Sequence, residues 1–461
     1  MNIADTPSPP LSRVTRLRHT LGLDGAVSFA VLGRAWLLLF SPLTFYLLVT
    51  RLTDVERGFY GNFSALVNLQ VFLELGFSQS IVQFTSHEFA RLRLLPSGAL
   101  EGDPAALSRL ISVGRLAIGY YCGMALIFVV AVGGIGSWFF STAPDSAKVE
   151  WVRAWWLLCV FAGCNLAFLP FVCLLEGCNQ VVFVNGCRMA AMVSSGIFLW
   201  GALVARAHLF AAAISSGGMF LATLVVVFWR WWRFFRVFRS PPPGPVVSWS
   251  REIWPFQWKI ACSAVSGYLI FQLFNPVILQ LKGAVEAGRM YLALQLINAL
   301  TQVSNSWVAT KAPQYGILIS SGRFQELDRL SRRSILQSLI VCLAGSGALL
   351  VALELLHHYT PWGGKILGYD SFCWLIVAAL TTQVLFGQAI YLRAHKQEPF
   401  LFLSVVNALL TATAVLMGAS RNGSLGACAG YALVQLLILP FATAVFFRCR
   451  HLWHSSTSIR P

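Results

Sequence analysis

The sequence has 461 residues, of which 57% are hydrophobic and 11% are charged, with a mean hydropathy of +0.68 and a formal net charge of +16. Soluble domains carry about 25% charged residues, so this composition excludes an ordinary soluble protein. A membrane-spanning helix needs about 20 mostly apolar residues, and apolar runs of about this length cover nearly the whole chain. We therefore predict an all-α polytopic membrane protein with no large soluble domain.

Twelve membrane spans are predicted, and an even number returns the chain to its starting side. With the N-terminus in the cytoplasm, 23 Lys and Arg residues fall in inner segments and 9 in outer segments. This bias is the positive-inside pattern, so we predict that both termini are cytoplasmic and that no nucleic-acid partner explains the net charge. The predicted spans are residues 26–49, 59–83, 110–133, 152–174, 181–203, 209–230, 259–281, 289–311, 334–356, 371–391, 399–418 and 425–447.

The N-terminal tail, residues 1–25, is rich in proline and then in arginine, which suits the anionic cytoplasmic surface. No cleavable signal peptide is expected, because the first apolar run is full length. Arg34 lies inside the first span and Glu74 inside the second, at matched depths from the inner side. A facing ion pair between them is one interpretation. The alternative is that the Arg34 head reaches back to the membrane surface.

A cytoplasmic linker at residues 231–258 divides the chain near its midpoint. It begins with Trp, Phe and Arg residues and contains the breaker Pro-Pro-Pro-Gly-Pro, which is typical of an interfacial segment followed by a domain boundary. We predict an N-lobe at 26–230, a C-lobe at 259–447 and a cytoplasmic tail at 448–461. Arg115, early in the third span, is expected to point toward the inner surface.

An internal repeat supports this division into two lobes. Residues 55–58, Val-Glu-Arg-Gly, recur as residues 285–288, Val-Glu-Ala-Gly, and the same offset aligns Asn68 with Asn298. Halves of six spans each share one orientation in the membrane. We therefore predict parallel copies related by a pseudo-two-fold axis along the membrane normal, with a site between them near the midplane.

The eighth predicted span carries a row of amide side chains and no charged residue between Arg289 and Lys311. The spacings of three and four residues place these amides on one helix face. An amide that faces hydrocarbon is costly, so the row is expected to line a water-filled cavity. The alternative is that the amides bind neighbouring helices. The row consists of Gln295, Asn298, Gln302 and Asn305.

Further candidates for a cavity lie in the seventh span, which begins at Lys259 and contains Gln272 and Asn275. The eleven cysteines are scattered through apolar spans without the paired spacing of a metal site. We expect no metal and no other cofactor. No Gly-rich nucleotide-binding loop is present in the sequence either.

Three segments resemble one family of membrane proteins. They are the turn and span LTDVERGFYGNFSALVNLQVFLELGFSQSIVQF, the turn LLEG after the fourth span, and the stretches VEAGRMYLAL and KAPQYGILISSGRFQELDRLSRRS. With the span count and order, the chain resembles the polysaccharide-exporter, or O-antigen flippase (Wzx-type), branch of the multidrug/oligosaccharidyl-lipid/polysaccharide (MOP) flippase superfamily.

This resemblance implies a two-lobe bundle of twelve helices in the bacterial cytoplasmic membrane. Such a protein would carry a polyprenyl-diphosphate-linked oligosaccharide to the outer leaflet by alternating access, with membrane lipids and the polysaccharide polymerase and export machinery as partners. The chain departs from expectation in having few acidic residues inside spans, chiefly Glu74 and Glu354. A carboxylate site for a coupling ion is therefore in doubt.

A lipid diphosphate needs a cation inside the membrane, and a guanidinium group fits phosphate oxygens well. Arg34 is the best candidate, with Arg115 and Lys259 nearer the inner mouth. Moving two negative charges outward against an inside-negative potential gains roughly 4–5 kcal/mol at 100 mV, so the membrane potential alone could drive the cycle.

Two other functions stay open at this point. A drug/cation antiporter would need a buried carboxylate as its ion site, for which Glu74 is the candidate. An integral membrane polymerase or ligase acting on lipid-linked sugars would need a large outer loop with catalytic groups, and the predicted outer loops are short. We therefore expect a transporter and not an enzyme.

Replacing Arg34 tests the role of a buried cation. The Arg34→Ala variant is expected to abolish surface glycan while the protein stays folded in the membrane, because the diphosphate loses its charged partner. Surface glycan staining and membrane-fraction immunoblotting measure the two quantities. Unchanged glycan display would show that Arg34 is a group that reaches to the membrane surface.

Overall fold

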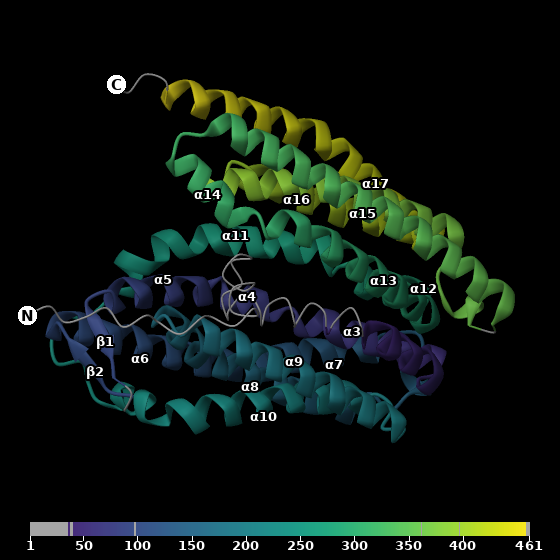
Figure 1. The fold of residues 1–461 in the computed structure, drawn as a ribbon. Helices are drawn as coiled ribbons and strands as arrows, with labels where there is room; N and C mark the ends of the chain where they lie inside the picture. The colour runs from purple at the N-terminus through teal and green to yellow at the C-terminus, as the bar shows by residue number, and fades with distance from the viewer. Residues whose placement is uncertain (1–35, 37–39, 96–97, 361, 396, 458–461) are drawn as a thin grey trace, which may run out of the picture.

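A computed structural model describes residue 36 and residues 40–95, 98–360, 362–395 and 397–457. The helices pack side by side in two layers (Figure 1). One layer, the N-bundle, contains α3 to α10, and the other, the C-bundle, contains α11 to α17. The last residues of the first predicted span, 40–49, are helical, and this helix continues to residue 51; Arg34 lies outside the described residues.

The elements of the N-bundle follow each other with short turns. They are α3 (Asp54–Val67), α4 (Gln70–Glu74), α5 (Phe77–Phe89), β1 (Leu92–Leu94), β2 (Leu100–Gly102), α6 (Pro104–Ile127), the π-helical turn η1 (Phe128–Val132), α7 (Gly133–Ser141), the 3-10 turn η2 (Ser146–Lys148), α8 (Val152–Gly177), α9 (Val181–Val204), α10 (Phe210–Phe235) and the 3-10 turn η3 (Arg236–Arg239).

The C-bundle begins after the linker. Its elements are the π-helical turn η4 (Trp249–Ile253), α11 (Trp254–Phe271), α12 (Phe274–Lys282), α13 (Ala284–Ala309), α14 (Ala312–Ser320), α15 (Phe324–Tyr359), the 3-10 turn η5 (Gly363–Lys365), α16 (Tyr369–Ala394) and α17 (Leu401–Thr457). The helix α10 continues five residues beyond the predicted sixth span, so the start of the predicted linker is helical.

The helix lengths agree with the predicted membrane fold. Within the described residues, eight helices are long and apolar enough to cross a membrane, and the bent run from α3 to α5 makes a ninth. The helix α17 has 57 residues and contains non-helical backbone at Asn422 and Gly423, so it covers two predicted spans. The predicted eighth span is α13, which is less apolar because of its amides. The first predicted span lies mostly outside the described residues.

Residues 84–109, which separate the second and third predicted spans, contain a small antiparallel hairpin. Leu92 pairs with Gly102 and Leu94 with Leu100. Gly102 has a φ of 143°, and a Cβ atom there would lie 2.4 Å from the Arg91 carbonyl oxygen. A glycine is therefore needed for the strand to close on the chain before it. Alternation over three residues is too short to predict such a strand from sequence.

Two ends of the bundle can be distinguished. The basic end carries the hairpin, η3, α14 and the end of α17, and the far end carries the start of α3, η2, the turn at Gly283 and the break at Asn422–Gly423 (Figure 1). By the charge bias of the sequence, the basic end is expected to be cytoplasmic.

The two bundles approach most closely where α3 packs against α13 near the far end. A Cβ atom on Gly58 would lie 2.0 Å from the Ala284 carbonyl oxygen, and one on Gly288 would lie 3.0 Å from the Asp54 carbonyl oxygen. Both glycines end the repeated four-residue segments found in the sequence. The repeat therefore marks the surfaces at which the bundles meet, and only a hydrogen atom fits between the backbones.

Replacing Gly58 tests this backbone contact. Gly58→Ala is expected to destabilise the protein by about 1–3 kcal/mol, because the added methyl group overlaps the α13 backbone. The apparent melting temperature of the purified protein in detergent measures the effect. Gly123→Ala is a matched control, since Gly123 lies in α6 with open space beside it. Equal melting temperatures for the two variants would show that the bundles do not touch at Gly58.

Candidate functional site

Two interrupted helices face each other where the bundles meet. In the N-bundle, the run from α3 to α5 bends by 47° at a break where Leu75 and Gly76 have φ values of 49° and 67°. In the C-bundle, α11 ends at Phe271 and α12 begins at Phe274. The Tyr268 hydroxyl of α11 donates to the Ala65 carbonyl oxygen of α3 at 3.2 Å. Interrupted helices at a repeat interface commonly form transport sites, because their freed backbone groups can bind polar ligands.

The amide row on α13 is largely open. Gln295, Asn298 and Gln302 are exposed and Asn305 is half-buried. Among the described residues, Gln295 alone of the four has a side-chain hydrogen bond, donated to the Tyr291 hydroxyl at 2.9 Å. In this conformation the row therefore does not bind a neighbouring helix.

The opposite face of α13 is packed. Ser304 is buried, and its carbonyl oxygen accepts a hydrogen bond from the Ser338 hydroxyl of α15 at 2.6 Å. A Cβ atom on Gly345 of α15 would lie 2.3 Å from the Leu300 side chain. Because α15 holds this face, the amide face turns away from α15 and begins at Tyr291, which contacts Tyr60 of the N-bundle with ring centroids 5.8 Å apart.

Gln272 and Asn275 flank the break between α11 and α12. Gln272 is half-buried and caps α11, while Asn275 is buried. The Asn275 side-chain oxygen has no hydrogen-bond partner among the described residues. A buried amide oxygen without a partner is costly, so it is a position where a ligand hydroxyl or water would be stabilised.

Glu74 ends α4 directly before the bend, and it is half-buried. Its carboxylate accepts a hydrogen bond from the Ser78 hydroxyl and lies close enough to Tyr120 and Tyr121 of α6 to interact electrostatically. These neighbours of the Glu74 carboxylate all belong to the N-bundle. The predicted pair with Arg34 stays a prediction, because Arg34 lies outside the described residues.

The other two predicted cations lie toward the basic end. Arg115 is exposed, and its guanidinium donates to the Arg239 carbonyl oxygen at 3.0 Å, which places it against the linker. Lys259 lies in the second turn of α11. The structure therefore places the amides of α13 and the residues Gln272 and Asn275 in the C-bundle, and Glu74 and Arg115 in the N-bundle.

A clamp at the basic end was not predicted from sequence. The Arg109 guanidinium of α6 donates to Glu88 of α5 and to Glu252 of η4, both at 2.7 Å. The Arg109 guanidinium, followed by the Ser248 backbone amide, lowers the pKa of the Glu252 carboxyl below its usual value. The start of the C-bundle is thereby fixed to the N-bundle at neutral pH. Nothing local in the sequence indicates the partners of Arg109.

No protein-family model matches this sequence, and no curated protein sequence matches it. Solved structures do match over nearly the whole chain. An inward-facing multidrug resistance MATE family transporter of the MOP superfamily has a TM-score of 0.62 at 14% identity, covering 93% of this chain and 99% of that one.

Two further structures agree. The lipid II flippase MurJ, in an inward closed conformation, has a TM-score of 0.60 at 10% identity, covering 93% of this chain and 90% of that one. The eukaryotic MATE transporter AtDTX14 has a TM-score of 0.57 at 12% identity, covering 95% and 99%. The chain has the MOP fold. The predicted all-α polytopic membrane architecture is therefore confirmed.

In this MOP fold, equivalent carboxylates tie each half together at the far end. Glu56 of the first repeated segment bonds His208 Nδ1, in the turn between α9 and α10, at 2.7 Å. Glu286 of the second accepts from the Ser424 backbone amide and hydroxyl at 2.7 and 2.6 Å. The repeated glutamates thus anchor the last turn at the far end of their own bundle, a role that the sequence repeat indicated only by position.

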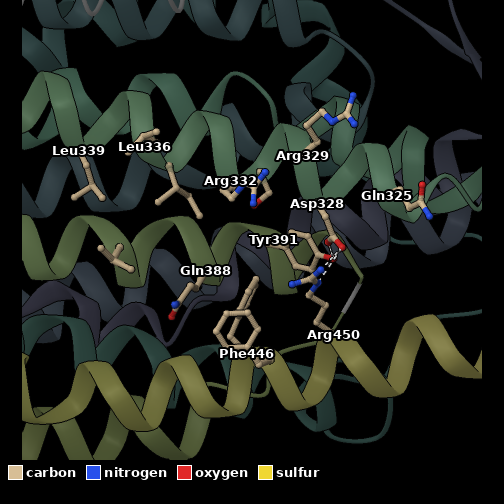
Figure 2. Close-up of a pocket in the computed structure, with 14 residues that line it drawn as sticks. Gln325, Asp328, Arg329, Arg332, Leu336, Leu339, Gln388, Tyr391, Phe446 and Arg450 are labelled. Atoms are coloured by element: carbon tan, nitrogen blue, oxygen red, sulfur yellow. Dashed lines mark hydrogen bonds and ion pairs between the residues drawn. The ribbon is translucent and has the colours of Figure 1, made fainter.

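A cavity of about 560 Å³ lies near the basic end of the MOP fold, within the C-bundle (Figure 2). None of the predicted site residues lines it. Its walls are α15 and the second half of α17, with α16 between them. The lining residues are Gln325, Asp328, Arg329, Ser331, Arg332, Ile335, Leu336, Leu339, Val384, Gln388, Tyr391, Phe446, Phe447 and Arg450.

Asp145 connects the two bundles of the MOP fold at the far end. It follows α7, accepts a hydrogen bond from the Ala284 backbone amide at the start of α13 at 2.9 Å, and pairs with Lys148 at 2.8 Å. The Lys148 ammonium and then the Ala284 amide lower the pKa of the Asp145 carboxyl. The ionised form is therefore the one that holds the contact.

Acid is expected to weaken this contact. Because the pKa of Asp145 is lower in the folded than in the unfolded protein, ionised Asp145 stabilises the fold fully above the unfolded-state pKa of about 3.9. This contribution to stability is lost as the pH falls through the folded-state pKa. Asp145→Ala should lower stability at neutral pH by about 1 kcal/mol, since the cap of α13 is lost. Melting temperatures of wild type and variant from about pH 7 to about pH 3 test both effects.

Asp145→Asn is the matched control, because its amide oxygen can still accept from Ala284 while the charge is absent. This variant should keep most of the neutral-pH stability and lose the acid dependence that Asp145 contributes. Superimposable curves for wild type and Asp145→Ala at every pH would contradict a role for Asp145 between the bundles.

Proposed function

We propose that this protein is a transporter that carries a polyprenyl-diphosphate-linked oligosaccharide from the inner to the outer leaflet of a bacterial cytoplasmic membrane by alternating access. One observation carries the proposal: in a MOP fold closed at the far end by α3 and α13, an uncharged amide row continues along α13 toward the basic end. The proposal includes three predictions made from the sequence: membership of the polysaccharide-exporter branch, the boundaries of the two lobes, and the cytoplasmic position of both termini.

The chemistry of the amide row suits a sugar chain. Asn298 and Gln302 each offer donors and an acceptor, and neither side chain has a partner among the described residues. Amides can exchange hydrogen bonds among many sugar hydroxyls without trapping a charge. The apolar helices around them keep ions out, so the site would select polar, uncharged groups and leave the diphosphate to a cation such as Arg34.

The far-end contact supplies the gate. For the substrate to leave on the outer side, α3 and α13 must separate, and the bonds made by Asp145 to Ala284 must break. The bonds that Glu56 and Glu286 make lie within their own bundles, so each bundle can move as a rigid body. A shift of this kind between two packed bodies is the usual basis of alternating access in repeated folds.

A drug/cation antiporter is the second candidate, and a specific observation favours it. Glu74 is half-buried beside a helix bend and two tyrosines, which is a plausible environment for a coupling carboxylate. The structural matches include two MATE transporters and one lipid II flippase with similar TM-scores, so they do not separate the candidates. Separate replacement of the amides and of Glu74 distinguishes the two functions.

Flipping by purified protein in liposomes tests the proposal directly. With a fluorescent polyprenyl-diphosphate oligosaccharide as probe, Asn298→Ala with Gln302→Ala should slow outward transfer by about tenfold or more, since two hydrogen bonds of about 1 kcal/mol each are lost. Quenching of the probe in the outer leaflet measures the rate. Gln397→Ala, which removes an exposed amide from the turn before α17, is the matched control.

The two candidates give opposite patterns in this assay. Glu74→Gln should leave glycolipid transfer within about twofold of wild type if the membrane potential drives the cycle. Proton-coupled efflux of organic cations by the wild type, abolished by Glu74→Gln, with no transfer of the glycolipid, would overturn the proposal in favour of an antiporter.

A further inference from the structure

The cavity in the C-bundle is a groove with a charged entrance and an apolar wall. Figure 2 shows Arg329 and Arg332 on α15 and Arg450 on α17, with Gln388 and Tyr391 of α16 between the two helices. Three guanidinium groups and one carboxylate, that of Asp328, line the groove, so its formal charge is three minus one, or +2. The groove is therefore suited to an anion.

The carboxylate is already occupied by groups of the groove itself. Asp328 accepts from the Tyr391 hydroxyl at 2.8 Å and from Arg450 at 2.9 Å through Nε. These bonds orient the Arg450 guanidinium. In contrast, Arg329 and Arg332 are exposed, and neither has a hydrogen-bond or ion-pair partner in the part of the chain that the structure describes. Two unpaired guanidinium groups three residues apart on one helix face are left for a ligand.

The depth of these arginines matches the headgroup layer of a membrane. The helix α15 has 36 residues, or about 54 Å of length, which exceeds the about 30 Å of a bilayer's hydrocarbon core. Arg329 and Arg332 lie about 8 and 12 Å from its first residue. Arg450 lies seven residues before the end of α17, at a similar depth. All three are thus within reach of lipid phosphates at the basic end.

Beyond the arginines the groove becomes apolar. Leu336 of α15 and Phe447 of α17 line it and are 56% and 53% exposed, and Leu339 continues the same wall one turn deeper. An exposed leucine and phenylalanine on membrane-length helices fit an acyl chain. On the floor, Gln388 is buried, and its side-chain oxygen has no partner among the described residues, which leaves an acceptor for a hydroxyl group.

We propose that this groove binds one anionic glycerophospholipid of the leaflet at the basic end. Its phosphodiester lies beside Arg332 and Arg450, with Arg329 at the outer rim of the groove, and one acyl chain runs along Leu336, Leu339 and Phe447. Basic pockets between membrane helices on the cytoplasmic side commonly hold anionic headgroups. No lining residue comes from the N-bundle or from α13, so this lipid is separate from the transported substrate and the inference does not depend on the proposed function.

Native mass spectrometry of the delipidated full-length protein tests the site. Phosphatidylglycerol and phosphatidylcholine with the same acyl chains are the probes. The wild type should bind phosphatidylglycerol at least about tenfold more tightly. The arginines make charge-assisted bonds to the phosphate of either lipid, but in phosphatidylcholine the choline cation competes with them for that phosphate. Arg329→Gln with Arg332→Gln should reduce this preference about tenfold. Arg333→Gln is the matched control, because Arg333 is an exposed neighbour on α15 outside the lining.

Several results would overturn the inference. Equal retention of the two lipids by the wild type would do so, as would a double variant that binds phosphatidylglycerol like the wild type. Release of the lipid by millimolar inorganic phosphate would indicate a site for free anions. Displacement one for one by a polyprenyl-diphosphate oligosaccharide would assign the groove to the substrate. If the glutamine variant fails to fold, Arg329→Lys with Arg332→Lys keeps the charge and should retain the headgroup preference with reduced affinity.

Discussion

The backbone contact between α3 and α13 is the constraint on which the rest of this structure depends. Gly58 and Gly288 allow two membrane helices from different halves of the chain to approach until backbone meets backbone. In a bilayer no hydrophobic driving force holds one apolar helix to another, so close packing of small residues has to supply the attraction. The bundles are therefore joined firmly at the far end, around the repeated segments.

Polar groups around this contact strengthen it. Asp145 caps α13 from the opposite bundle, Gln280 of α12 donates to the Phe139 carbonyl oxygen at 2.7 Å, and Lys365 donates to the Val49 carbonyl oxygen at 3.3 Å. Each of these bonds is modest and reversible. A contact made of small residues and several weak polar bonds can be closed in one state and open in another, which a fused hydrophobic core could not do.

Polar groups inside the membrane are distributed differently in the two bundles. The C-bundle presents amides along α13 and at the α11–α12 break, whereas the N-bundle places its carboxylate, Glu74, among the hydroxyls of Ser78 and the tyrosines of α6. Several charges at the basic end form ion pairs, as in the clamp between Arg109, Glu88 and Glu252. Among the described residues, Arg329 and Arg332 have no such partner, and a lipid headgroup would supply the opposite charge.

Much of the architecture follows from the sequence alone. Apolar run length, the bias of Lys and Arg and the repeated Val-Glu-x-Gly segments determine an all-helical membrane protein, because span length and backbone hydrogen bonding in lipid leave few alternatives. The spacing of Gln295, Asn298 and Gln302 determines that they share a face, because helix periodicity is local. The β1–β2 hairpin, by contrast, is too short for its residues to indicate it.

Only the tertiary structure decided which residues contact each other across the fold. The sequence could not show that Gly58 meets Ala284, that Arg109 joins Glu252, or that Arg332 and Arg450 line one groove, because each pair joins residues more than a hundred positions apart. Such contacts depend on how whole helices pack, and packing is set by the combined shape of many side chains. The repeat indicated two related halves, whereas the surfaces at which they meet became visible only in the fold.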